Sequence, residues 1–168
     1  ICSSIISEPD IELSKLYRNI NSLLYENIKN RLLSEHFMTI SLFAMDRDEK
    51  FKYIGSHIDQ VLYRASENKC ELLTTDTIWA GIMEDIEEDI NESSFTMDSG
   101  DILLLFTDGL IEVMNENDEL FYMDRVTEIL KENHDKSADD IKMKILQEVF
   151  SFMNVQDDDI TVCLIKKK

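Results

Sequence analysis

The sequence predicts a single α+β domain with antiparallel strands, and three observations support that class. Residues 10–33 repeat apolar side chains with helical spacing, whereas residues 36–73 change to short runs rich in β-branched and aromatic residues. The most apolar run, residues 102–106, is followed by two further helical patterns and a last strand-like run. The domain is expected to cover residues 1–168, with the helix at 10–33 and the core at 36–165.

The first segment, residues 10–33, is predicted to be one long amphipathic helix. Pro9 and Asp10 stand where the start of a helix favours them. We interpret its apolar stripe as a face that packs on the protein core rather than as a partner-binding face. The stripe consists of Leu13, Leu16, Ile20, Leu23, Leu24, Ile28 and Leu32.

The second segment is predicted to be a meander of short strands joined by polar turns. Residues 46–48 separate the first two strands and faintly resemble the start of a calcium loop. No glycine follows at the sixth position, and Ser56 and His57 stand where the closing glutamate would be, so we predict a hairpin turn. The expected strands cover residues 36–45, 51–54, 61–63 and 71–73.

The second half begins with an acidic stretch, residues 84–92, which we interpret as a solvated loop. A short strand is possible at residues 95–97, and the run at 102–106 is typical of a strand buried on both faces. Two helices should follow, the first near residues 124–130 and the second from Ala138 to Phe152 with Ser137 as its N-cap. A strand at 160–165 and a frayed tail at 166–168 complete the prediction.

Composition excludes several classes of protein. Seventeen Lys and Arg against 35 Asp and Glu give a net charge of −18, which is unsuited to nucleic acid or to anionic membranes. No apolar run approaches the roughly 20 residues of a membrane span. The three cysteines, Cys2, Cys70 and Cys163, suggest neither a disulfide framework nor a zinc site, so we expect a reducing, cytoplasmic setting.

Two acidic corners stand out at the ends of predicted strands. Asp108 follows the most apolar strand, and residues 157–159, all aspartate, precede the last one. A carboxylate at the edge of a buried sheet is costly unless it is paired, and no Lys or Arg lies within the ten residues before Asp108. A divalent cation is a natural partner, and oxygen ligands suit Mg²⁺ or Mn²⁺ rather than zinc. From spacing alone, an ordinary Asp-Gly turn and a solvated corner remain open.

These corners belong to a longer pattern that resembles a known family. The stretch at residues 100–112 reads GDILLLFTDGLIE, and residues 158–162 read DDITV. Between the strands, residues 53–57 read YIGSH and residues 80–82 read AGI. Together, and in their order along the chain, these motifs resemble those of the bacterial metal-dependent serine/threonine phosphatases of the PPM (type-2C) superfamily. The similarity is greater to the branch named for stage II sporulation protein E.

The resemblance implies a fold and a site. The fold would be an α–β–β–α sandwich of two antiparallel sheets flanked by helices, with the metal site at one end. Asp108 and Asp158 would be terminal ligands of two Mn²⁺ or Mg²⁺ ions and thereby catalytic residues. Gly109 would permit the tight turn that exposes Asp108, Thr161 would begin the last strand, and Asp159 would face solvent or support the ligands.

One departure from the family pattern is important. The family has an earlier metal motif, Asp-x-Ser-Gly-His-Gly, and this motif occurs nowhere in the 168 residues. The aspartate that would bridge both metals is therefore absent. Either the chain is an N-terminally incomplete piece of a longer phosphatase or the motif has been lost, and the start at Ile1 favours the first alternative.

The resemblance implies hydrolysis of phosphoserine or phosphothreonine by metal-activated water. The substrate would be a phosphorylated bacterial regulatory protein, such as an anti-anti-sigma factor, and an upstream sensor domain could control the reaction. The alternatives are a non-catalytic pseudophosphatase or binding module with the same fold, and an acidic structural domain without metal. Because missing early strands would bare sheet edges, we also expect self-association, for example as a homodimer.

Overall fold

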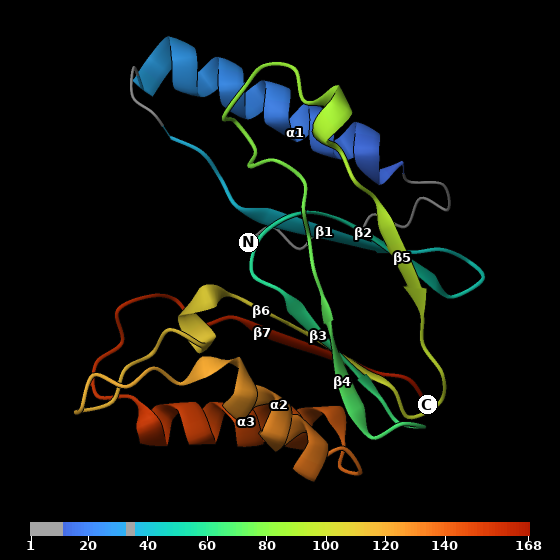
Figure 1. The fold of residues 1–168 in the computed structure, drawn as a ribbon, viewed down its shortest axis with the longest axis vertical. Helices are drawn as coiled ribbons and strands as arrows, with labels where there is room; N and C mark the ends of the chain where they lie inside the picture. Colours follow the sequence, from blue (N-terminus) through green and yellow to red (C-terminus); the bar gives the residue numbers. More distant parts are fainter. Residues whose placement is uncertain (1–11, 33–35) are drawn as a thin grey trace. The chain divides into compact units, whose positions relative to one another are not determined.

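The computed structural model describes residues 12–32 and 36–168, apart from the side chains of residues 31 and 32. The chain divides into two compact units (Figure 1). The first unit comprises residues 1–57 and 75–96, and the second unit comprises residues 58–74 and 97–168. In the described part of the chain, no helix has the length and apolar character that would let it cross a membrane.

The first unit combines a helix with a three-stranded antiparallel sheet. Helix α1 (Leu13–Asn27) confirms the helix that the spacing of the apolar residues predicts. It continues into a π-helical turn at Ile28–Leu32, which that spacing did not predict. The sheet has the order β1-β2-β5, and a 3₁₀ turn, η2 (Glu87–Asp89), precedes its last strand. Its strands are β1 (Ile40–Met45), β2 (Lys50–Ser56) and β5 (Ser93–Thr96).

Helix α1 packs an apolar face into the core of this unit, as expected, but Leu23 of the predicted stripe is 62% exposed and lies outside that face. Leu13 and Tyr17 are buried and cluster with Ile54 of β2. The Tyr17 hydroxyl donates a hydrogen bond to the carbonyl of Ile78 at 2.6 Å, and burial raises the pKa of this phenol to about 12. Pro9 and Asp10, the predicted start signals, lie outside the described residues.

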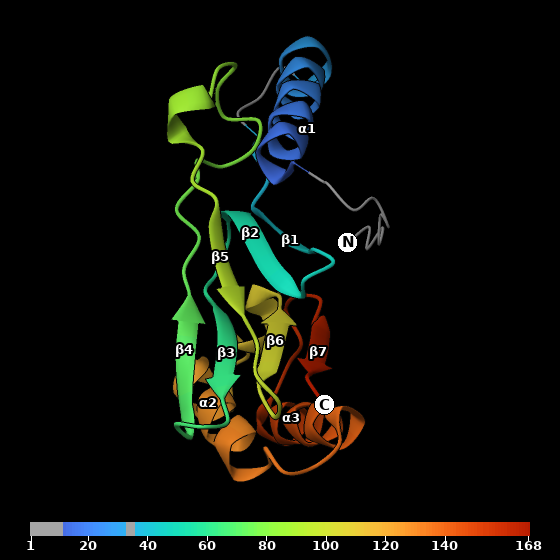
Figure 2. The same cartoon turned by 90° about the vertical axis from the view of Figure 1, so that its right-hand side faces the viewer.

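The second unit is a four-stranded antiparallel sheet covered by two helices, in the order β4-β3-β6-β7. Helix α2 contacts β3 and β4, and α3 contacts β7 (Figures 1 and 2). The strands are β3 (Gln60–Arg64), β4 (Lys69–Leu73), β6 (Ile102–Phe106) and β7 (Val162–Lys166). The two covering helices are α2 (Tyr122–Glu132) and α3 (Ala138–Phe152). A 3₁₀ turn, η3 (Asp108–Leu110), follows β6.

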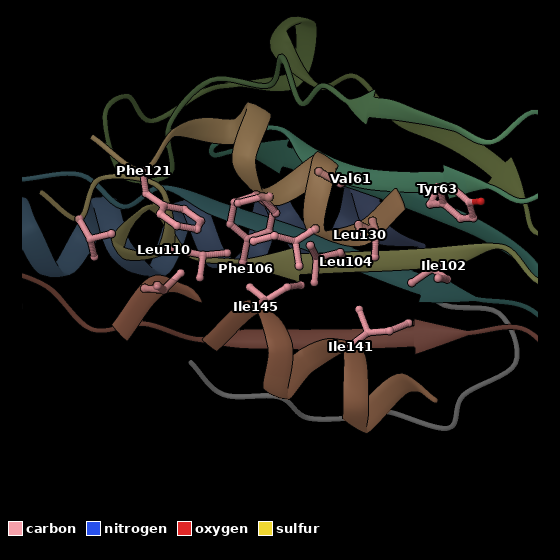
Figure 3. Packing of buried hydrophobic residues seen from close by; sticks show 14 residues of the cluster. Val61, Tyr63, Ile102, Leu104, Phe106, Leu110, Phe121, Leu130, Ile141 and Ile145 are labelled. Carbon is pink, nitrogen blue, oxygen red and sulfur yellow. The ribbon is translucent and has the colours of Figure 1, made fainter. Parts of the chain in front are cut away.

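The core of this unit lies between the sheet and its helices. Alternate residues of β6, Ile102, Leu104 and Phe106, point toward the helices, where they meet Ile141 and Ile145 of α3 (Figure 3). Leu103, on the other face of β6, is also fully buried, which confirms a strand that is buried on both faces. The period-two alternation of β6 and the helical spacing of α3 thus meet in one apolar layer.

Most local predictions are confirmed. The Asp46 side chain accepts hydrogen bonds from the backbone N–H groups of Asp48 and Lys50, each at 2.9 Å, and so closes the predicted hairpin turn. The Ser137 hydroxyl caps α3 by accepting from the Asp140 N–H at 3.2 Å. In the acidic stretch, η2 is exposed throughout, as a solvated loop should be.

The C-terminal prediction is wrong in two respects. Strand β7 runs from Val162 to Lys166, two residues after the expected start. Lys166 and Lys167 are not frayed: the Lys166 ammonium donates to the carbonyls of His134 and Lys136 at 2.6 and 2.7 Å. The Lys167 backbone pairs with Gly100 and Asp101, so sheet pairing continues past the last apolar residue.

Asp101 anchors the start of β6 although it is only 1% exposed. Its carboxylate accepts from the Ala65 N–H at 2.9 Å, from the Asp98 N–H at 3.0 Å and from the Arg64 guanidinium at 3.0 Å. Burial raises the pKa of this carboxyl, but the three donors outweigh burial and hold the pKa below its usual range. The ionised form is therefore the one that the fold stabilises.

We predict that Asp101→Asn lowers the free energy of unfolding by about 2 kcal/mol at neutral pH, because it weakens a buried ion pair and its hydrogen bonds. Because the folded-state pKa is depressed, this stabilisation is present above the unfolded pKa and disappears as the pH falls through the folded one. Urea unfolding at several pH values measures the effect. A difference from the parent chain that stays constant down to strongly acidic pH would contradict it.

Candidate metal centre

The two aspartates singled out from the sequence belong to adjacent ends of two paired strands. Asp108 opens the 3₁₀ turn η3 directly after β6, and its side chain is half-buried. Asp158 is exposed and stands four residues before β7. Because β6 and β7 are antiparallel, the end of one lies beside the start of the other, with Phe106 opposite Val162 as the last pair. The topology of the second unit therefore brings the two motifs to one edge of the sheet.

Thr107 connects the two strand ends. Its backbone N–H donates to the carbonyl of Thr161 at 3.2 Å, and its hydroxyl donates to the carbonyl of Asp159 at 3.0 Å. The same hydroxyl oxygen accepts from the Thr161 N–H at 3.0 Å. Thr107 thus joins the end of β6 to the residues before β7 and fixes the segment that carries Asp158 against the segment that carries Asp108.

Gly109 makes the closest approach between these segments. A Cβ atom at this position would lie 2.6 Å from the carbonyl oxygen of Asp159, a distance that no side chain tolerates. The expectation that glycine is needed here for a tight turn requires a correction, because Gly109 is not among the glycines with positive φ. Glycine is required because the backbone of the second motif passes directly over it.

Each carboxylate is oriented by a neighbouring backbone N–H. Asp108 Oδ1 accepts from the Gly109 N–H at 3.1 Å, and Asp158 Oδ1 accepts from the Asp159 N–H at 2.7 Å. The Gln156 amide also donates to the Asp158 carbonyl at 3.0 Å. Within the described residues, neither carboxylate has a Lys or Arg as an ion-pair partner, so the charge that the sequence left uncompensated stays uncompensated in the fold.

The oxygen ligands at this corner are of the kind that a hard divalent cation prefers, but they are too few to hold one. Two carboxylates and nearby backbone carbonyls are the oxygen ligands that Mg²⁺ and Mn²⁺ prefer. Among residues 12–32 and 36–168, however, no group of three or more His, Cys, Asp or Glu side chains could hold a metal. Asp108 and Asp158 alone are therefore too few to form a metal centre, and further ligands would have to complete one.

Sequence reasoning missed Gln60, whose buried side chain holds the backbone at the end of β6. Its side chain is only 2% exposed, and its amide pairs with the Phe106 backbone. The amide oxygen accepts from the Phe106 N–H at 2.7 Å, and the amide nitrogen donates to the Phe106 carbonyl at 3.2 Å. The last residue of β6 is thus fixed immediately before Thr107. A lone glutamine at the start of a strand gives no sequence signal for such a role.

His57 lies in the first unit and is held through its backbone. Its N–H donates to the Thr75 hydroxyl oxygen at 3.1 Å, and the same hydroxyl donates to the His57 carbonyl at 3.2 Å. These hydrogen bonds join the end of β2 to the segment that follows β4. They involve the His57 backbone and the Thr75 hydroxyl and no imidazole nitrogen.

We predict that Thr107→Val lowers the free energy of unfolding by about 1–2 kcal/mol, because the isosteric change leaves the Asp159 carbonyl and the Thr161 N–H without their hydroxyl partner. Thr107→Ser keeps the hydroxyl and should lose less than half as much. Chemical denaturation compares the two variants, and amide NMR shifts at residues 158–161 report the local change. Equal losses for valine and serine would contradict a hydrogen-bonding role.

Comparison with known proteins identifies the family of the chain. The family model of stage II sporulation protein E (SpoIIE) matches residues 2–168. The chain is 23% identical over 176 residues to phosphoserine phosphatase RsbU of Bacillus subtilis (strain 168). The matched region covers 100% of this chain and 51% of that protein. It therefore spans about half the length of that curated relative.

Solved structures show the same fold. The SiaA-PP2C domain of Pseudomonas aeruginosa superimposes with a TM-score of 0.69 at 14% identity, covering 93% of this chain and 70% of that one. The manganese-presoaked phosphatase domain of SpoIIE from Bacillus subtilis gives 0.61 at 19% identity, covering 95% and 67%. These likenesses confirm the expected α+β fold with two antiparallel sheets. With the family model matching nearly its whole length, the chain belongs to the SpoIIE family of phosphatase domains.

Proposed function

We propose that this chain is the metal-binding and catalytic part of a protein serine/threonine phosphatase. The observation that carries the proposal is the convergence of Asp108 and Asp158, which the Thr107 hydrogen bonds and the Gly109 contact hold at one sheet edge. Family membership supports it, as does the similarity to a phosphoserine phosphatase. The reaction is hydrolysis of a phosphoric monoester by water.

The roles of the residues follow from their chemistry. Asp108 and Asp158 would each direct one carboxylate oxygen to a divalent cation, while their other oxygen keeps its backbone hydrogen bond. Mn²⁺ or Mg²⁺, when bound, supplies a hydroxide nucleophile at neutral pH and neutralises charge on the phosphoryl group. Thr107 and Gln60 are positioning residues, since they act on the backbone that carries Asp108.

Charge supports the requirement for metal. Residues 97–121 carry seven acidic residues and no Lys or Arg, and all seven except the buried Asp101 are at least partly exposed. A phosphorylated serine or threonine brings further negative charge and would be repelled from this surface without bound cations. We propose that the substrate is a small phosphorylated regulatory protein of the anti-anti-sigma type, as the resemblance to the family implies. The free thiols of Cys70 and Cys163 are consistent with a reducing, cytoplasmic setting.

One observation favours a second candidate, a non-catalytic module that binds a single cation or a partner protein. The described residues offer two acidic ligands at this corner where a two-metal centre needs more, and the Asp-x-Ser-Gly-His-Gly motif does not occur. The two candidates differ in one respect: whether a further carboxylate reaches this sheet edge in the protein. They predict the same metal preference and opposite outcomes for turnover.

The test is Mn²⁺-dependent release of phosphate from a phosphoserine peptide. We predict release that EDTA abolishes and that Asp108→Asn and Asp158→Asn each reduce by at least about 100-fold, since loss of a direct ligand should cost no less than loss of a group that supports one. Asp118→Asn is the matched control, because Asp118 is an exposed aspartate of the same acidic segment outside the site. Its release should stay within about twofold of the parent chain, as for a neutral surface change.

Two results would contradict the proposal. Equal release by the parent chain and Asp108→Asn would show that the turnover comes from elsewhere. Mn²⁺ binding that depends on both aspartates without any release of phosphate would contradict catalysis by these residues alone. The same assay on a longer chain that begins before helix α1 then distinguishes an incomplete phosphatase, which gains activity, from the non-catalytic candidate, which does not. Circular dichroism of each variant establishes that the fold is intact before activities are compared.

A further inference from the structure

The first unit exposes a stacked pair of aromatic rings, remote in sequence from the two aspartates. Phe37 and Trp79 lie with their ring centroids 4.4 Å apart and their planes at 18°, yet they are 50% and 42% exposed. Ile82 and Met83 follow Trp79 and are 46% and 42% exposed. We call these four residues the aromatic patch. Scattered single apolar residues are normal on a surface, but an exposed cluster often marks an interaction site.

The backbone beneath the patch is held firmly. Met38 and Ala80 exchange two backbone hydrogen bonds, at 2.8 and 3.0 Å, so the residues that follow Phe37 and Trp79 are paired. The fully buried Asn21 of α1 donates to the carbonyls of Met83 and Glu84 at 2.9 and 3.3 Å. Its amide oxygen accepts from the Gly81 N–H at 2.8 Å.

Gly81 adds to this rigidity because it lets the loop lie directly on α1. A Cβ atom there would lie 2.9 Å from Ile28 Cδ1 and 3.2 Å from Leu24 Cβ. The apolar side chains are thus presented from a fixed loop rather than from a mobile one. A surface that is ordered before binding loses little conformational entropy when a partner docks.

An acidic run continues directly from the patch. Glu84, Asp85, Glu87, Glu88 and Asp89 are all exposed, and the loop that carries them lies beside α1 (Figure 2). Residues 75–96 contain seven acidic residues and no Lys or Arg. Within this run Ile86 is buried in the core of the unit, which fixes the run to the body of the unit. Apolar contact area and concentrated negative charge therefore occur on one rigid segment.

We propose that the aromatic patch and residues 84–89 form a docking site for a basic amphipathic segment of a partner protein. Apolar side chains of that segment would cover Phe37 and Trp79, and its Lys or Arg side chains would face the acidic run. A second copy of this chain fits poorly, because a symmetric contact would place two acidic runs against each other. Nucleic acid is repelled by the same charge. This site is independent of the proposed phosphatase activity.

The chain contains one tryptophan, Trp79, so its fluorescence reports directly on the patch. The probe is an amphipathic helical peptide with leucine on one face and lysine on the other, compared with a peptide that carries glutamate in place of lysine. We predict a blue shift of the Trp79 emission with the lysine peptide only. Anisotropy of the labelled peptide gives the affinity, which Phe37→Ser should weaken about tenfold or more, as for a central contact residue.

Matched controls separate docking from general attraction. Phe150→Ser removes an aromatic side chain that is similarly exposed in the second unit and should leave the affinity unchanged. Glu84→Gln, Glu87→Gln and Glu88→Gln combined should weaken binding. Glu116→Gln, Glu128→Gln and Glu132→Gln combined remove the same charge from exposed positions elsewhere and should have little effect.

Three results would overturn the proposal. Equal loss of affinity for the two triple variants would show that net charge alone attracts the peptide. An equal blue shift with the glutamate peptide would remove the requirement for a basic partner. A blue shift of the chain alone with rising concentration, together with a dimer in sedimentation, would show that a second copy covers the patch.

Discussion

The close contact between the β6 exit and the segment before β7 is the constraint on which the candidate site depends. Gly109 lies against the Asp159 carbonyl, and the Thr107 hydroxyl forms hydrogen bonds with the Asp159 carbonyl and the Thr161 N–H. Two negatively charged side chains are thus brought to one sheet edge in the absence of a basic partner among the described residues. Like charges favour separation, so the backbone must impose the arrangement, and the proposed cation would remove its electrostatic cost.

The net charge of −18 has different meanings in different parts of the chain. At Asp101 the negative charge is buried and compensated by Arg64, and it serves stability. At Asp108 and Asp158 it is fixed by backbone contacts and has no basic ion-pair partner among the described residues, which is the basis of the proposed cation site. In residues 84–89 it is exposed beside apolar rings, as a docking surface for a basic segment requires. Composition alone cannot distinguish these roles, because burial and partners define them.

Much of this arrangement could be predicted from the sequence, for identifiable reasons. Helix α3 and strand β6 have strong periodicity, and their bounds agree with the expected ones. The pairing of the two aspartate motifs was implied by the family resemblance. Gln60 and Asn21 could not be predicted, because their roles depend on long-range backbone contacts that leave no local pattern. The backbone conformation of Tyr122 could not be predicted either. Its φ of 60° is one that tyrosine disfavours, and its N–H donates to the Ile111 carbonyl.

The most direct test of the joint site is paramagnetic broadening of amide NMR signals by Mn²⁺ added well below one equivalent. If Asp108 and Asp158 hold one centre, signals from residues 107–110 and 157–160 broaden first and together, ahead of those from residues 84–89, which carry five acidic side chains. Broadening of only one motif, or simultaneous broadening of every acidic segment, would show that the two aspartates do not form a common metal site.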